Sequence, residues 1–282
     1  MPTRLVGGEA VASYSQRHAS RNFSTAKEIE KAAEEQGFSV PGTKSASERV
    51  TLWRDLGGLH ERAFTEPQIV AGNWVIERPL CERCAPAHER ARGRLPRIGM
   101  VCVRHKRWLG QEQVDVAPIA ETIVAERHWR RLLTPCGIVV ECPVVLLAEE
   151  AATVGISKAV LEERAQRVAV PSPALLVYPE TVRLARLLTR PSFLDAVLGD
   201  ATAAWKRTMV EREVGMVLPD AEDAENWRAV ARVWDLVLGL QDVVRDARLL
   251  GTVPEDRWNV LRLWSGFAEF EAVEVSRIDQ LM

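Results

Sequence analysis

Three cysteines and one histidine in a short segment have the spacing of a metal site. They form two pairs, Cys81-x2-Cys84 and Cys102-x2-His105, with 17 residues between the pairs. Zinc prefers four tetrahedral thiolate or imidazole ligands, and a two-residue gap lets one tight turn direct both members of a pair at a single ion. We therefore expect one structural zinc per chain, held by these four residues. A site with four protein ligands leaves no open position for substrate, which argues against a catalytic zinc.

Other candidate ligands fit a metal less well. His88 lies four residues after Cys84 but outside both pairs, so we interpret it as a surface histidine. Cys136 and Cys142 flank an apolar run, and buried thiols are a simpler interpretation of them than a second metal site. An odd number of cysteines, three of them in one segment, suits a reducing compartment better than a disulfide framework. The first residues lack the apolar run of a signal peptide or a membrane span, so we expect a cytoplasmic protein with no membrane contact.

The segment around the predicted metal site is strongly basic. Residues 78 to 107 carry nine Lys and Arg against two Glu, although the whole chain has a formal net charge of −2. Arginine suits bidentate contact with phosphate, so this segment is a candidate DNA-binding surface. The alternative is a solubilising shell whose charge is offset by the acidic part of the chain after residue 135. The candidate nucleic-acid contacts are Arg90, Arg92, Arg94, Arg97, Arg104, Lys106 and Arg107.

Motifs for catalysis do not occur in the sequence. There is no Gly-x4-Gly-Lys-Ser/Thr phosphate loop, no Gly-x-Gly-x-x-Gly, no Gly-x-Ser-x-Gly and no His-Glu-x-x-His. Paired acids such as Glu149 and Glu150 fall in predicted helices, where a solvated face is the commoner interpretation. The inventory therefore predicts a binding protein and not an enzyme.

Helix signals dominate the chain, so we expect a mostly α fold in three parts. Thr25 with Glu28, and Ser45 with Glu48, have the spacing of capping boxes at helix starts. Residues 1–75 are predicted to form a small helical domain resembling a helix-turn-helix domain. Residues 76–113 are predicted to form a zinc ribbon or knuckle module, because they contain many Pro and Gly and few apolar residues. Residues 114–282 are predicted to form a C-terminal helical bundle.

In the C-terminal part, apolar periodicity predicts a helix from residue 114 to 131 and six further helices. Residues 168–174 read as a loop between sub-bundles. The clearest helix is 223–250, in which an apolar stripe recurs at helical spacing and predicts that Trp227 and Trp234 lie in the core. The six further helices are expected at 143–154, 157–168, 179–189, 192–215, 223–250 and 255–272.

One segment of that bundle has features of a DNA-reading helix-turn-helix. In residues 147–165, Ala151, Gly155 and Ile156 stand where such a motif needs a small residue, a turn glycine and a packing residue. The second helix of the pair carries Glu162 and Glu163, which repel phosphate. A plain helical hairpin is therefore favoured over a base-reading motif.

Two stretches of the chain resemble the TniQ family, the target-selection proteins of Tn7-like transposons, which includes TnsD. Near the N-terminus, residues 8–19 are similar to the family pattern Gly-Glu-Ser-Leu-x-Ser-Trp-Leu-x-Arg-Leu-Ala, with Tyr14 in place of the tryptophan. The second stretch resembles the family pattern Cys-Pro-x-Cys, Arg-Leu, Cys-Pro-x-His-Gly-x-x-Leu. Glu82 and Val103 replace its prolines, and Lys106 replaces its glycine. The matching residues are Gly8, Glu9, Ser13, Arg17, Cys81, Cys84, Arg94, Leu95, Val101, Cys102, His105 and Leu109.

The resemblance implies a zinc-containing adaptor that links a target to a transposition complex. Its expected partners are target DNA or an RNA-guided effector, an ATPase resembling TnsC or other transposition proteins, and a second copy of the chain as a homodimer. The resemblance covers about residues 8 to 110. Two alternatives stay open: a helix-turn-helix regulator that reads DNA through residues 147–165, and a structural protein that binds only other proteins.

Overall fold

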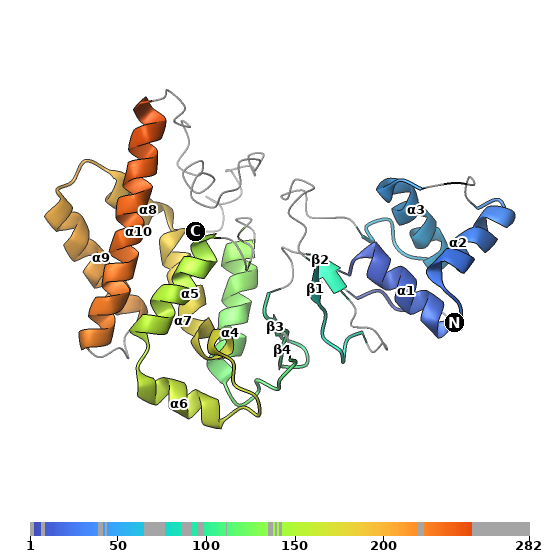
Figure 1. Ribbon diagram of the computed structural model, residues 1–282, viewed down its shortest axis with the longest axis horizontal. Helices are drawn as coiled ribbons and strands as arrows, with labels where there is room; N and C mark the ends of the chain where they lie inside the picture. Colours follow the sequence, from blue (N-terminus) through green and yellow to red (C-terminus); the bar gives the residue numbers. More distant parts are fainter. Residues whose placement is uncertain are drawn as a thin grey trace. The chain divides into compact units, whose positions relative to one another are not determined.

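The structure is a computed structural model, and its elements confirm the mostly α fold. Contacts within the chain divide it into two compact units, Met1–Ile98 with Leu109–Gln113 and Gly99–Trp108 with Val114–Met282 (Figure 1). The predicted three-part division stays a prediction. The residues that the structure describes are 3–6, 9–38, 42, 44–64, 77–85, 92–94, 99–110, 112–134, 138, 140, 143–218 and 223–249.

The first unit begins with three helices, α1 (Val11–Arg21), α2 (Ala26–Glu35) and α3 (Ala46–Gly57). Both predicted capping boxes are present: the Thr25 and Ser45 hydroxyls each accept the backbone N–H of the glutamate three residues later, and each donates its own backbone N–H to that glutamate's carboxylate. The helices surround an aromatic core in which Tyr14 and Trp53 are fully buried. The unit also contains β1 (Glu77–Pro79) and β2 (Arg92–Arg94), which pair antiparallel.

The second unit begins with a short hairpin, β3 (Val101–Cys102) and β4 (Arg107–Trp108). It continues with α4 (Ala120–His128), the π-helical turn η1 (Trp129–Leu133), α5 (Pro143–Gly155) and α6 (Lys158–Gln166). The remaining helices are α7 (Pro173–Leu188), α8 (Pro191–Leu198), α9 (Ala203–Val217) and α10 (Asp223–Leu249). Helix α7 is the centre of this bundle: it packs on α5, α4 and α9, while α10 covers α5 and α9 (Figure 1).

The helix predicted for 114–131 begins later than expected. Residues 114–116 extend the hairpin instead, because Trp108 donates its N–H to the Val114 carbonyl and Val116 donates to the Lys106 carbonyl. The predicted helix 192–215 is two helices, since the chain breaks at Gly199 and Thr202 caps a new helix. The helix predicted for 179–189 already begins at Pro173, so the loop prediction for 168–174 was too long.

The prediction that the tryptophans of α10 lie in the core is wrong for Trp227, and Trp234 is only half-buried. Trp227 is 61% exposed, whereas Val230, Val233 and Val237 are buried. At about 100° per residue, Trp227 lies about a quarter of a turn away from the centre of that buried stripe. The helix predicted for 255–272, together with His88, Cys136 and Cys142, lies outside the described residues.

No helix among the described residues is both long and apolar enough to cross a membrane.

Candidate metal centre

The first cysteine pair lies in a tight turn. Cys84 and Ala85 both donate their backbone N–H to the Cys81 carbonyl, over 2.9 and 3.0 Å. Cys81 is buried and Cys84 is half-buried. This is the local geometry that the two-residue spacing predicts, since one turn brings two thiols to the same side of the chain.

The second pair lies in the β3–β4 hairpin. Cys102 ends β3 and is buried, and His105 is half-buried in the turn before β4. The Cys102 Sγ atom lies 3.7 Å from His105 Nδ1. Lys106 completes the turn with a φ of +52°, a left-handed conformation that normally favours glycine.

All four predicted ligands come together. One ligand atom from each of Cys81, Cys84, Cys102 and His105 lies within 4.8 Å of the others. Zinc bonds of about 2.0–2.3 Å place tetrahedral ligand atoms about 3.6–3.8 Å apart, so the gathered atoms need to close by only about 1 Å. Three sulfurs and one imidazole nitrogen form a donor set typical of structural zinc. These residues could therefore hold a metal, which would supply a cross-link to a segment with little apolar content.

A glutamine that sequence reasoning missed supports the first pair. The Gln113 side chain donates through Nε2 to the Leu80 carbonyl over 2.7 Å and accepts the Glu82 N–H at Oε1 over 3.0 Å. Its amide thus brackets Cys81 from both sides. Since an amide offers both a donor and an acceptor, one side chain satisfies backbone groups that the turn leaves open.

A buried glutamate supports the strand of the second pair, and it was also missed. Glu126 on α4 is fully buried and accepts the Val101 N–H over 3.1 Å and the Tyr178 hydroxyl over 2.7 Å, both at Oε2. Arg130 donates to Glu126 Oε1 over 2.6 Å and to the Val101 carbonyl over 2.8 Å. Both backbone groups of the residue before Cys102 are therefore held by side chains of the helical bundle.

The residues around Glu126 are closely packed. A Cβ atom on Gly99 would lie 2.3 Å from a carboxylate oxygen of Glu126, so only glycine allows this approach. The Trp108 ring packs edge-on against Tyr178 with centroids 5.2 Å apart. Burial raises the pKa of Glu126, although Arg130 opposes that shift, and burial next to Glu126 raises the pKa of Tyr178 well above its usual value.

The structure describes only part of the basic surface predicted to bind DNA. Arg104 and Lys106 are exposed in the β3–β4 turn, and Arg107 is half-buried in β4. The backbones of Arg92 and Arg94 form part of β2, but their side chains are outside the described residues, as are Arg90 and Arg97 altogether. DNA binding by this surface stays a prediction.

The helix pair at 147–165 is present as α5 and α6, joined at Ile156 and Ser157. Gly155, expected as a turn glycine, is the last residue of α5, and close packing on α10 favours glycine there. A Cβ atom at this position would lie 2.5 Å from the Ala229 Cβ. Arg164 on α6 is buried and forms a bidentate ion pair with Glu180, with bonds of 2.6 and 3.0 Å. These contacts give Gly155 and Arg164 roles in bundle packing, and DNA reading by this segment stays an untested alternative.

Comparison of the chain with protein-family models, with curated proteins and with solved structures finds no match.

Proposed function

We propose that the chain is a zinc-containing adaptor of the TniQ kind, which links a transposition target to the transposition machinery. In this role it contacts target DNA or an RNA-guided effector, and it engages an ATPase resembling TnsC. The observation that carries the proposal is the gathering of Cys81, Cys84, Cys102 and His105. The proposal includes zinc as the metal, one structural ion per chain, and no catalytic activity.

The N-terminal half of the resemblance has a physical basis that supports the proposal. Glu9, Ser13 and Arg17 are spaced four residues apart, and all three are buried. Arg17 donates to Glu9 over 2.6 and 2.8 Å, and Ser13 donates to it over 3.0 Å. Arg17 also donates to the Arg4 carbonyl over 2.8 Å, which fixes the N-terminal arm to α1. Three of the four residues that match the N-terminal pattern therefore form one connected network, which supports the proposal.

The hairpin turn gives independent support. Lys106 stands where the family pattern has glycine, and its φ of +52° is the conformation that makes glycine favourable there. Lys106 therefore differs from the family pattern in residue type but adopts the backbone conformation that glycine favours.

Zinc binding is tested by metal analysis of the purified chain and of Cys81→Ser and Cys102→Ser variants. The expected result is about one zinc per wild-type chain and loss of the metal in both variants. Lys158→Ser, a change at a residue that is 87% exposed in the second unit, is the matched control and should keep the metal. Retention of a full zinc by both cysteine variants would contradict the assignment.

DNA contact is tested by the salt dependence of duplex binding. Each phosphate contact that is lost lowers the slope of log affinity against log salt by about 0.9, so changing Arg92, Arg94, Arg97 and Arg104 together to Gln should lower it by up to about 3.6. The matched control changes four other arginines by the same charge: Arg207, Arg228, Arg232 and Arg245. If log affinity falls with log salt at the same slope for both variants, the basic segment does not contact DNA.

The adaptor role itself is tested by complex formation and by gene context. If the chain is such an adaptor, we expect neighbouring genes to encode a transposase and an ATPase. We also expect that ATPase to form a stable complex with the full chain. Sequence-specific DNA binding with a cost of about 1–3 kcal/mol per mismatched base pair would instead favour the helix-turn-helix regulator. A stable protein complex without any DNA binding would favour the structural alternative.

A further inference from the structure

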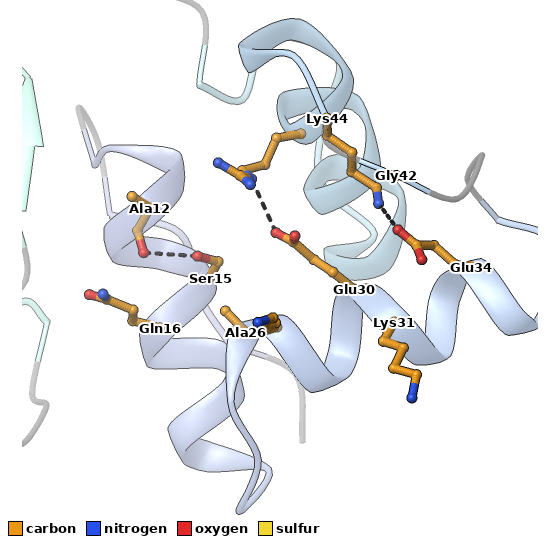
Figure 2. A pocket seen from close by; sticks show the side chains of 11 residues that line it. Ala12, Ser15, Gln16, Ala26, Glu30, Lys31, Glu34, Gly42 and Lys44 are labelled. Atoms are coloured by element: carbon orange, nitrogen blue, oxygen red, sulfur yellow. Dashed lines mark hydrogen bonds and ion pairs between the residues drawn. The ribbon is translucent and has the colours of Figure 1, made fainter.

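The three N-terminal helices and the segment between α2 and α3 border an open hollow of about 670 Å³, separate from the predicted metal ligands. Small side chains form part of its wall: Ala12 and Ser15 on α1 and Ala26 on α2 (Figure 2). Because these side chains are small, the backbone of a bound chain can approach closely. The volume of the hollow lies in the usual range for ligand sites. The remaining lining residues are Gln16, Lys27, Glu30, Lys31, Glu34, Gly42, Lys44 and Arg49.

This hollow has a surplus of positive charge. Its four cations outnumber its two acids, and each acid already has a cation of its own. Arg49 lies 3.2 Å from Glu30, and Lys44 pairs with Glu34 (Figure 2). Glu30 also accepts the Trp53 indole N–H. The surplus consists of two lysines one turn apart on α2. Lys27 has no ion pair with a described residue, and the contact of Lys31 with Glu35, at 3.9 Å, joins two exposed groups.

An exposed aromatic residue, Phe23, precedes the α2 residues of the hollow in the sequence. Helices α1, α2 and α3 end in the same way, with two backbone bonds around a residue in the left-handed conformation. In α2 and α3 that residue is glycine, Gly37 and Gly58, but in α1 it is Phe23, with a φ of +55°. Phe23 is 95% exposed, three residues before Ala26 of the hollow. The unfavourable backbone gains no internal packing, so the packing of this unit does not account for the phenyl ring.

From these observations we infer that the hollow and Phe23 form a docking surface for an acidic peptide segment of a protein partner. Carboxylates of the segment pair with Lys27 and Lys31, and an apolar side chain packs on Phe23. The inference rests on the proposed adaptor role, for which it names the chemistry of one partner. A nucleic acid fits less well, because the surplus consists of only two lysines one turn apart, which offers few contacts to a continuous polyanion.

The probe is a displayed library of random decapeptides, selected against the zinc-loaded full chain. Enriched peptides are then labelled, and their affinity is measured by fluorescence anisotropy. We expect enriched sequences with at least two Asp or Glu and one large apolar residue. Lys27→Glu with Lys31→Glu should weaken their binding at least about fivefold at low salt. The matched control is Lys158→Glu with Arg207→Glu, an equal charge change at exposed residues of the second unit, and it should leave affinity within about twofold.

Phe23→Gly separates a docking role from a structural one. Glycine relieves the backbone, so this variant should melt about 2–4 °C higher than the wild type and yet bind the peptide more weakly. Loss of affinity in a more stable protein cannot come from unfolding. No enrichment, enriched peptides without acids, or affinity unchanged by both sets of variants would overturn the inference. It would also be overturned if the lysine variants lowered affinity for duplex DNA and left peptide binding intact. Variants of Arg92, Arg94, Arg97 and Arg104 should not affect peptide binding, so the proposed DNA contact can fail separately.

Discussion

Replacing Glu126 with alanine should weaken metal binding without touching a metal ligand. The carboxylate accepts the Val101 N–H and the Tyr178 hydroxyl at one oxygen, and alanine leaves both donors buried without that acceptor. Each such donor costs about 1–3 kcal/mol. The Arg130 side chain is 42% exposed, so water can replace its bond to Glu126 and it adds little. We therefore expect a loss of about 3 kcal/mol in the free energy of unfolding.

The same change should lower zinc affinity by about 10–100-fold, because supporting residues around metal ligands commonly have effects of that size. The physical reason is that Val101 directly precedes Cys102, and its backbone loses both the acceptor and the side chain that orients Arg130. Zinc affinity is measured by competition with a chromogenic chelator, and stability by urea denaturation of the zinc-loaded protein.

Glu126→Gln is the matched control. The amide oxygen can take the place of Oε2 and keep the bonds from Val101 and Tyr178, while only the bond from Arg130 is lost. Its zinc affinity should therefore stay within a few-fold of the wild type. If alanine lowers stability but leaves zinc affinity unchanged, Glu126 is only a packing residue of the bundle. If glutamine is as harmful as alanine, the negative charge matters and the two bonds at Oε2 are not the reason for the effect.

Four further changes test other parts of the structure. Lys106→Gly should raise stability by about 1 kcal/mol in thermal unfolding, because it removes a side chain from a left-handed turn; an unchanged Tm would contradict the strain. Arg17→Met should cost about 3–5 kcal/mol in urea unfolding, since it leaves the buried Glu9 carboxylate without its partner. Burial lowers the pKa of His18, so its folded form binds fewer protons than the unfolded form just below pH 6.5. The stability present above that pH is lost as the pH falls, and His18→Gln should flatten this dependence in unfolding measured from pH 5 to 7. Gly155→Ala should cost about 1–3 kcal/mol, because its methyl group would meet Ala229 on α10; an unchanged Tm would show that the helices shift freely.

The sequence is most informative where the interaction is local. A capping box joins residues three apart, so Thr25 with Glu28 and Ser45 with Glu48 can be recognised from residue spacing alone. The turn at Cys81 and Cys84 is local in the same sense. Helix boundaries are predicted wrongly where distant contacts decide. Pro179 suggests a helix start, yet it lies inside α7, whose first turn is set by Ser172 accepting the Leu175 N–H.

The supporting residues of the metal centre could not be predicted for the same reason. Gln113 lies 31 residues from Glu82, and Glu126 lies 25 residues from Val101, so no spacing rule connects them. Glu126 stands at helical spacing from the buried Ile123, Trp129 and Leu133, so its place on an apolar stripe is a signal of burial that the sequence analysis did not use. Burying a carboxylate needs several hydrogen-bond donors. The donors to Glu126 include the Val101 backbone and Tyr178 on α7, and no local sequence pattern identifies them.

The bracketing of Cys81 by Gln113 and of Val101 by Glu126 and Arg130 has a consequence for the rate of metal exchange. A zinc finger that is unfolded without metal must order its chain whenever an ion arrives, and it loses that order when the ion leaves. Here side chains outside the ligand pairs hold the backbone on both sides of Cys81 and directly before Cys102. Uptake of zinc should then be limited by encounter and by shedding of water from the ion, and amide hydrogens of the β3–β4 hairpin should exchange slowly even after a chelator has removed the metal.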